Sequence, residues 1–372
     1  MLRWKENSNI SVYKQMSSLR VLSLAKYGRM GASSRMRSIQ YVPFALSAGY
    51  QVTLNALLSD ELLSKRYLTG RYGYLALIHA YSERIRLLIR RKNFDLIWIE
   101  KEALPWWPES VEAILLSGVP YVLDYDDAVF HNYDINGSWM VRKLLGSRLD
   151  KLMSKAALVT AGNGYLAQRA INAGAPWVEV VPTVVDLHRY PFGRSAKIFT
   201  TLRIAWIGSP STARYLHLLR EPLRQLSLKV PFALRVIGAT DLHLPGVKVE
   251  YVPWTEDTEV DSISSCAVGI MPLEDSPWEK GKCGYKLIQY MACSLPVVAS
   301  AVGANVEIVE DGKNGYLVRS TDEWVVALHT LLESPRLRAE MGKAGRARVE
   351  ENYCLQKTGP RLVELLRVAS KK

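Results

Sequence analysis

The stretch that decides the fold is residues 281–318, GKCGYKLIQYMACSLPVVASAVGANVEIVEDGKNGYLV. It opens with a glycine loop and continues into an apolar-periodic segment that predicts a helix over 285–293. A continuous apolar run predicts a buried strand over 295–300. After a turn and a short helix within 303–309, a last strand is expected over 315–318. The stretch therefore predicts a helix–strand unit that presents a glycine loop.

The start of this predicted helix suits an anionic ligand. Glycine lets the backbone approach a ligand closely, and a helix N-terminus offers N–H groups and partial positive charge, which favour phosphate. Lys286 stands in the first helical turn, where a cation opposes the helix dipole. A bound anion would explain this lysine; an ordinary solvated surface lysine is the competing interpretation.

The same residues resemble the donor-site region of the retaining glycosyltransferases of family 4 (group 1). That family shows a pattern like E-x-F-G-x-x-x-x-E-A-M-A-x-G-x-P-V-V-A-[ST], then glycine turns and D-G-x-x-G. The positions in register here are Cys283-Gly284, Met291-Ala292, 295–300, Gly303, Asp311-Gly312 and Asn314-Gly315. The resemblance implies an α/β GT-B fold: two Rossmann-like domains facing across a cleft, with a C-terminal helix that crosses back to the first domain. It also implies sugar transfer from a nucleoside-diphosphate sugar, with retention and without metal.

Two acidic positions of that pattern are missing. The glutamates of the family's E-x7-E pair fall on Gly281 and Gln289. Gln289 can still hydrogen-bond ribose hydroxyls through its amide, whereas Gly281 offers only backbone groups. Glu279 is either a substitute carboxylate near the donor sugar or an ordinary loop residue. We therefore expect ribose binding to survive and carboxylate help at the sugar to be lost.

The segment that starts at residue 202 offers a further phosphate site, because a strand, a glycine turn and a helix are expected there. In the family, this turn carries an arginine and a lysine that clasp the donor diphosphate. Here Ser209 follows Gly208, so the arginine is absent, and Arg214 lies at or beside the lysine position. Hydroxyl and N–H groups at a helix start can cradle phosphate without a cation. The expected donor-binding residues are Gly208, Ser209, Ser211, Thr212, Arg214, Gly284, Lys286 and Gln289.

The first half of the chain predicts another Rossmann-like unit. A buried strand over 19–25 leads into a glycine turn and a helix that begins with serines. The turn lacks the full G-x-G-x-x-G of a dinucleotide site. In the family this loop faces the acceptor and the donor phosphates, which implies that role for Gly31, Ser33 and Arg35; a plain turn is the alternative. Further strands are expected over 50–57, 94–100, 119–125, 156–161 and 177–182, and in the second domain over 234–238, 247–252 and 267–271.

Two of these strand ends carry acidic side chains. Glu100 ends one strand, and Asp124, Asp126 and Asp127 follow the next, with His131 shortly after. Asp124-x-Asp126 resembles a metal-binding D-x-D motif, which we discount because that motif belongs to a single-domain glycosyltransferase fold. Carboxylates can bind sugar hydroxyls or accept a proton without metal. Asp126, Asp127 and His131 are therefore the candidate catalytic residues, with Glu100 on the acceptor side; a structural histidine is the alternative.

Length and composition fit two soluble domains. The 372 residues are divided by our prediction into a polar extension (1–18), an acceptor-side domain (19–190), a nucleotide-sugar domain (191–352) and a helix (353–372). No apolar run could cross a bilayer and no signal peptide is visible, so a cytoplasmic location is expected. The four cysteines lack metal-binding spacing, so neither a metal nor a cofactor is expected.

The formal net charge of +12 lies mainly in the first half of the chain. Over 65–92, basic residues alternate with tyrosines, and on an amphipathic helix they would suit an anionic membrane surface. A solvated helix face is the alternative; nucleic acid is not expected as a partner, because no nucleic-acid-binding motif accompanies the charge.

We expect a glycosyltransferase on the inner face of the cell membrane, acting on a saccharide or lipid-linked acceptor in cell-envelope or exopolysaccharide synthesis. A catalytically inactive GT-B partner of another glycosyltransferase, or a sugar-nucleotide epimerase, is the alternative.

Overall fold

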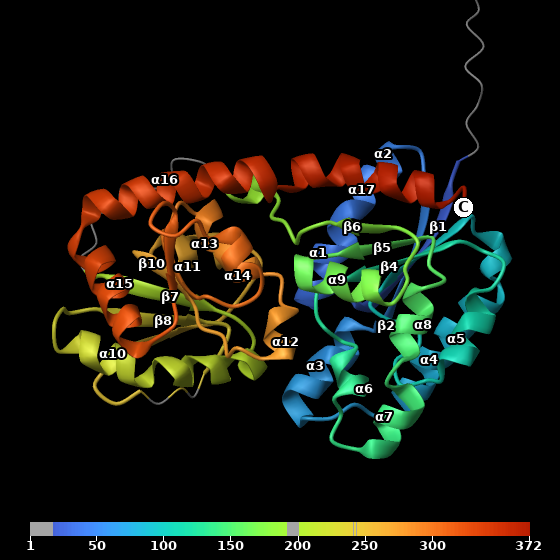
Figure 1. The fold of residues 1–372 in the computed structure, drawn as a ribbon, viewed down its shortest axis with the longest axis horizontal. Coiled ribbons are helices and arrows are strands. Elements are labelled where there is room, and N and C mark those ends of the chain that lie inside the picture. Colours follow the sequence, from blue (N-terminus) through green and yellow to red (C-terminus); the bar gives the residue numbers. More distant parts are fainter. Residues whose placement is uncertain (1–17, 192–200, 241, 243) are drawn as a thin grey trace, which may run out of the picture.

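Two parallel six-stranded sheets organise residues 18–191, 201–240, 242 and 244–372, which are the residues that the computed structural model describes. The strand order is β2-β1-β3-β4-β5-β6 in the first sheet and β12-β11-β10-β7-β8-β9 in the second. Figure 1 shows the sheets side by side, each surrounded by helices. The expected architecture of two Rossmann-like units is confirmed.

Every expected strand is present among the described residues, with ends shifted by a few residues at most. The first sheet contains β1 (Arg20–Tyr27), β2 (Gln51–Leu58), β3 (Leu96–Glu100), β4 (Tyr121–Tyr125), β5 (Leu158–Ala161) and β6 (Val178–Val180). The second contains β7 (Arg203–Ile207), β8 (Ala233–Ile237), β9 (Lys248–Val252), β10 (Val268–Met271), β11 (Val297–Ser300) and β12 (Gly315–Val318).

Helices connect the strands, and η marks the 3-10 helices. Around the first sheet lie α1 (Ala32–Arg37), η1 (Ile39–Tyr41), α2 (Val42–Ser47), α3 (Asp60–Thr69), α4 (Tyr74–Ile89), η2 (Arg91–Asn93), α5 (Glu109–Leu116), α6 (His131–Asp134), α7 (Trp139–Leu145), α8 (Arg148–Met153), α9 (Gly164–Asn172) and η3 (Leu187–Arg189). The rest are η4 (Pro210–Leu219), α10 (Arg220–Ser227), α11 (Glu259–Ser264), α12 (Pro277–Lys280), α13 (Tyr285–Ala292), α14 (Ala304–Ile308), α15 (Thr321–Glu333), α16 (Pro335–Asn352) and α17 (Leu355–Ala369).

One helix expectation was wrong. The basic, tyrosine-rich segment 65–92 is not one helix, because Gly70 adopts a left-handed φ of 75° and ends α3 before α4 begins. The helix expected after the Gly208 turn is present, as the 3-10 helix η4. No helix in the described part of the chain combines the length and the apolarity needed to span a bilayer.

The C-terminal helices join the two halves of the molecule. Figure 1 shows α16 along the second half and α17 along the first. Leu362 and Leu366 of α17 belong to the same buried cluster as Trp98 of β3, so α17 covers one face of the first sheet. This is the crossing helix that the sequence predicted.

The two segments that pass between the halves lie side by side. The Val185 N–H donates to the Tyr353 carbonyl at 3.1 Å, and the Leu355 N–H donates to the Val185 carbonyl at 2.9 Å. Our four domain boundaries stay predictions. Residues 1–17 of the predicted extension and residues 192–200, beside the predicted boundary, lie outside the described residues.

Candidate active site

The predicted site residues gather where the loops that follow the strands of one sheet meet those of the other. Strand order reverses between β1 and β3 in the first sheet and between β7 and β10 in the second. Such reversal points are where open parallel sheets bind ligands, at the carboxyl ends of the strands. Glu100 ends β3, and Gly208 directly follows β7. The topology therefore places acceptor-side and donor-side candidates at the two reversal points.

Lys286 and the turn after β7 converge on the donor side. The Lys286 ammonium lies 4.2 Å from the centre of the Trp206 ring. A Cβ built on Gly208 would stand 2.8 Å from Lys286 Nζ and 2.7 Å from Thr212 Oγ1, so only glycine leaves room between them. The Ser209 hydroxyl lies 2.9 Å from that of Ser211. A cation and a group of hydroxyls thus surround a glycine backbone, an arrangement suited to phosphate.

The electrostatics of Lys286 also favour an anion. Burial and the neighbouring charge of Lys282 lower the pKa of Lys286 to about 7. Among the described contacts no carboxylate pairs with its ammonium, and the side chain is half-buried. Gly284, with a φ of 62°, directly precedes α13, which begins at Tyr285, and a Cβ on Gly284 would lie 2.2 Å from Ile308 Cδ1. Within the described part of the chain, this half-buried cation therefore has no carboxylate partner at the helix start.

The missing family glutamate has no room in this structure. A Cβ on Gly281 would lie 2.4 Å from the Cβ of Ala128, which follows β4 in the other half of the molecule. Glu279 is buried instead, where it accepts hydrogen bonds from Tyr215 and Ser276. The guanidinium of Arg214 approaches Glu279 at 3.6 Å and stays largely exposed. The Arg214 guanidinium donates to the Tyr215 hydroxyl at 3.1 Å, which in turn donates to Glu279.

Gln289, expected at the ribose, is hydrogen-bonded inside the second half. It is buried, and its amide donates to the Tyr190 hydroxyl at 3.4 Å. Tyr190 in turn donates to Glu259 at 2.7 Å, and the Trp254 indole donates to the other Glu259 oxygen at 2.7 Å. Sequence reasoning missed Glu259, which brings a carboxylate to this part of the site from α11.

On the acceptor side, Ser33 connects two carboxylates. Its hydroxyl oxygen lies 2.7 Å from Glu100 Oε1 and 2.6 Å from Asp126 Oδ2. Lys101 Nζ lies 2.9 Å from both Ser33 Oγ and Asp126 Oδ1, and 3.4 Å from Asp127 Oδ2. Burial acts against the Lys101 charge, yet these carboxylates raise its pKa well above the usual value. The structure thus brings together Ser33, Glu100, Asp126 and Asp127, as predicted.

Lys101 is the residue of this cluster to which the sequence analysis gave no role. It is 4% exposed and holds a left-handed φ of 62°, which is rare outside glycine. A sequence signal was present, because Lys101 stands in a Glu-Lys-Glu run directly after an apolar strand. Charges at a strand end are expected to be paired when they are buried.

Two other residues of the acidic strand ends, His131 and Asp124, are engaged in structural contacts. Both His131 nitrogens are engaged, by Asp134 and by the Tyr165 hydroxyl, each at 2.8 Å. His131 would have to give up one of these bonds to act on a substrate. Asp124 is buried and bonded by Arg37 through two nitrogens, at 2.6 and 2.8 Å. Asp124 is therefore the buried partner of Arg37.

The remaining first-loop candidates lie at the contact between the halves. Gly31 precedes α1, and a Cβ there would overlap the Tyr27 side chain. The Arg35 guanidinium lies 4.8 Å from the centre of the Trp254 ring and donates to the Arg29 carbonyl at 2.9 Å. Arg29 also pairs with Glu256 through two hydrogen bonds, at 3.1 and 3.3 Å.

The donor-side loop is itself inserted into the first half. Cys283 packs in the same buried cluster as residues of β3 and β4, and its thiol donates to the Asp126 carbonyl at 3.1 Å. The Asn163 amide donates to the carbonyls of Lys280 and Lys282, at 3.1 and 2.9 Å. Lys282 approaches Asp127 at 3.8 Å. The loop that leads into Lys286 is therefore fixed directly beside the acceptor-side carboxylates.

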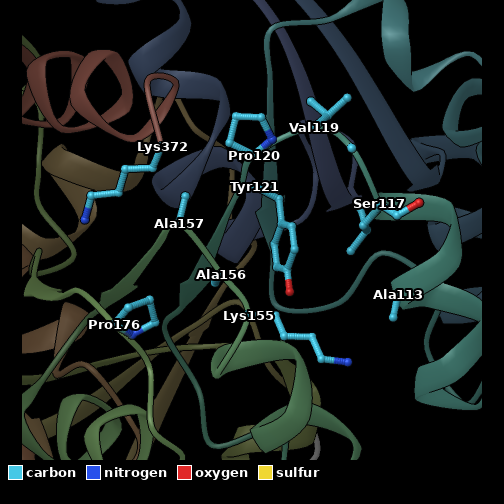
Figure 2. A pocket seen from close by; sticks show the side chains of 12 residues that line it. Ala113, Ser117, Val119, Pro120, Tyr121, Lys155, Ala156, Ala157, Pro176 and Lys372 are labelled. Carbon is cyan, nitrogen blue, oxygen red and sulfur yellow. The ribbon is translucent and has the colours of Figure 1, made fainter.

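A separate hollow of about 540 Å³ lies at the opposite edge of the first sheet (Figure 2). Pro120, Ala157 and Pro176, which precede β4, β5 and β6, line it together with Lys155 and Lys372. None of the predicted site residues is among its described lining residues. It lies at the amino ends of the strands and is not the candidate site.

Comparisons with known proteins agree with this geometry. Residues 201–334 match the family model described as "Glycosyl transferases group 1". The chain is 41% identical over 266 residues to the GDP-mannose-dependent alpha-(1-6)-phosphatidylinositol monomannoside mannosyltransferase of Mycolicibacterium smegmatis, covering 63% of this chain and 68% of that protein. The chain belongs to the group 1 glycosyltransferases. The resemblance noted in the sequence is thereby confirmed.

Solved structures extend the likeness of this glycosyltransferase to nearly its full length. HepE of Anabaena, in complex with UDP and glucose, superposes with a TM-score of 0.70 at 17% identity, covering 94% of this chain and 99% of that one. Sucrose-phosphate synthase of Thermosynechococcus elongatus gives 0.69 at 14% identity, with coverage of 94% and 98%. At these identities the likeness shows the fold, and the GT-B prediction is confirmed.

Proposed function

We propose that this glycosyltransferase moves a hexose from a nucleoside-diphosphate sugar to a hydroxyl of a saccharide or lipid-linked acceptor, with retention and without metal. The observation that carries the proposal is the convergence of Lys286, Gly208 and Thr212 around one backbone turn. Departure of the diphosphate is the difficult step of such a transfer, and fixed cations and N–H groups aimed at the leaving group stabilise it. Lys286 and Arg214 are the cations in position to do so.

The acceptor side supports the second half of the reaction. The Asp127 carboxylate lies 3.8 Å from Lys282, in the loop that leads into Lys286, and the Asp126 backbone contacts Cys283 of the same loop, so both residues border the donor side. A carboxylate there can bind the attacking hydroxyl and accept its proton. We propose retention of the anomeric configuration because the chain resembles the family-4 enzymes, and we name no nucleophile.

The relative from M. smegmatis suggests the first substrates to test. Its name gives GDP-mannose as donor and a phosphatidylinositol mannoside as acceptor. We would incubate the purified protein with GDP-mannose or UDP-glucose, in the presence of a chelator, with and without a glycolipid acceptor. Mass spectrometry would detect the product, and NMR would identify its anomeric configuration. Transfer lost in Lys286→Ala and retained in the loop variant Lys280→Ala would support the proposal. An inverted product would contradict the proposed retention, and dependence on a metal would contradict the proposed metal independence. Absence of transfer from every donor would refute the proposed glycosyltransferase activity.

A peripheral location on the inner face of the cell membrane, and a role in envelope or exopolysaccharide synthesis, are part of the same proposal. Near the α3–α4 turn, Leu68 and Leu75 are 86% and 83% exposed, and Lys65, Arg66 and Arg71 are exposed around them. Apolar side chains that protrude among cations suit an anionic lipid surface, where each cation contributes about 1 kcal/mol.

A second exposed patch supports the same orientation. On α7, Trp139, Met140 and Leu144 protrude beside Arg142 and Lys143. Figure 1 places α3 and α7 toward the same end of the first half. We expect co-sedimentation with phosphatidylglycerol vesicles but not with phosphatidylcholine vesicles, and loss of that binding in the double variant Leu68→Glu/Leu75→Glu. Unchanged vesicle binding by a folded double variant would refute this surface.

A further inference from the structure

The distances around Ser33 determine how many protons Ser33, Glu100 and Asp126 share in the acceptor-side cluster. A serine hydroxyl has one proton to donate and two lone pairs to accept with. Ser33 Oγ has three polar neighbours, at 2.9 Å (Lys101 Nζ), 2.7 Å (Glu100 Oε1) and 2.6 Å (Asp126 Oδ2). The Lys101 ammonium donates to one lone pair of the Ser33 hydroxyl oxygen. The single hydroxyl proton serves one carboxylate, so the other carboxylate must bring a proton of its own to lie at hydrogen-bond distance.

The surroundings decide which carboxylate holds that proton. Asp126 Oδ1 lies 2.9 Å from the Lys101 ammonium. Burial works against its charge, but Lys101 and Arg37 lower the pKa of Asp126 below its usual value. Glu100 is 0% exposed. Burial raises the pKa of Glu100; Lys101 opposes this, and the charge of Asp126 adds to it.

The contacts of Glu100 on its other side are neutral donors. Its Oε2 accepts from the Ser34 hydroxyl at 2.5 Å and from the Lys26 backbone N–H at 3.1 Å, so this oxygen needs no proton of its own. The charged groups that face Glu100 are Lys101, Asp126 and, from α4, Arg84. Arg84 donates to the carbonyls of Ala25 and Ala103 and to Asn55. Arg84 therefore acts on Glu100 through its charge alone, with no described hydrogen bond between them.

We propose that Glu100 is a neutral carboxylic acid that acts as a positioning residue: it donates to Ser33, and Ser33 in turn donates to an ionised Asp126. In this arrangement Asp126 accepts a hydrogen bond from Ser33 and forms an ion pair with Lys101 at 2.9 Å, which together fix its carboxylate as an acceptor for the substrate hydroxyl. Ionisation of Glu100 would place two negative carboxylates on one hydroxyl and release Asp126. The inference rests on the proposed function only in assigning Asp126 to the acceptor hydroxyl.

Glutamine at position 100 is the matched probe. Its amide oxygen can accept from Ser34 and Lys26, and its NH₂ group can donate to Ser33, as the neutral acid does. The infrared spectrum of the wild type at pH 7 should show a carboxylic-acid band that is absent in Glu100→Gln and unaffected in the exposed-residue control Glu83→Gln. The melting temperature of the wild type should fall relative to that of Glu100→Gln as the pH rises above 5, because the folded state holds a proton that the unfolded chain releases.

The functional readout is rescue. Glu100→Ala should raise the KM for the acceptor at least about tenfold, the effect of losing a contact of roughly 1.4 kcal/mol, and Glu100→Gln should reverse most of that rise. An absent acid band, or a glutamine variant as impaired as the alanine variant, would overturn the inference. If the wild type shows the acid band but transfers no sugar from any donor, the proposed function fails while the protonation of Glu100 stands.

Discussion

The lowered pKa of Lys286 predicts that donor binding takes up a proton. Its pKa of about 7 results from burial and from Lys282, so the Lys286 amino group is mostly neutral at pH 8 in the free protein. A diphosphate placed beside Gly208 would raise that pKa, because a nearby anion favours the charged form. About 0.9 proton should then be bound per nucleotide sugar at pH 8, and about 0.5 at pH 7.

The affinity should follow the same titration. Below pH 7 Lys286 is already charged and the Kd should be flat; above pH 7 it should rise by up to about tenfold per pH unit, until the pKa of the complex is reached. A hydrogen bond from a charged donor contributes roughly 1.5–3 kcal/mol, so Lys286→Ala should weaken binding about 10- to 150-fold at pH 6.5.

Isothermal titration calorimetry measures both quantities. We would titrate a nucleotide sugar, whose diphosphate has no group titrating near pH 7, in buffers of different ionisation enthalpy at pH 6.5, 7 and 8. Lys280→Ala is the control, because Lys280 pairs with Asp275 at 3.0 Å in the same segment and is 44% exposed. Lys282→Ala should move the proton uptake to higher pH. A Kd that is independent of pH, with no buffer-dependent enthalpy, would refute the assignment of Lys286 to the diphosphate.

Further predictions concern the contact between the halves and the buried charges. Gly281→Glu, which restores the family residue, should destabilise the protein by about 1–3 kcal/mol through overlap with Ala128, whereas Gly137→Glu, where a Cβ meets nothing within 4 Å, should be near neutral in urea unfolding. Asp124→Ala should cost about 3–5 kcal/mol by leaving Arg37 buried without its partner, and an unchanged unfolding midpoint would contradict this. Alkylation of Cys283 should be slow in the native protein, since burial raises the pKa of its thiol, and rapid labelling detected by mass spectrometry would show that the halves separate.

The fold was predictable because hydrophobic runs mark the buried parallel strands. Most of the strands read as short apolar runs bounded by turn residues, which is typical of strands covered on both faces. The edge strands β6 (VEV) and β9 (KVEYV) instead contain charged residues and are partly exposed. A single helix over 65–92 was expected from the alternation of basic residues and tyrosines, which gives no weight to Gly70; the left-handed φ of that residue ends α3.

The site was predictable where the chemistry is local in sequence. Lys286, Gly284 and Gly208 could be proposed because a glycine turn before a helix marks a phosphate site. Contacts between segments that are distant in the chain could not be predicted from the sequence. Nothing in the sequence pairs Glu259 with Tyr190, or Lys101 with Ser33, because these pairs depend on how strands and loops from separate units come together.

The insertion of Cys283 bears on how such enzymes could be recombined. Its thiol donates to the Asp126 carbonyl, and a Cβ on Gly162 would stand 2.2 Å from its sulfur. The cysteine side chain therefore fills a space that exists only because residue 162 is a glycine. Exchanging the donor half of this protein for that of another glycosyltransferase would bring in a bulkier phenylalanine, as the family pattern has at this position. A working chimera would therefore need a matched recess, with positions 128, 162 and 283 transplanted as one set.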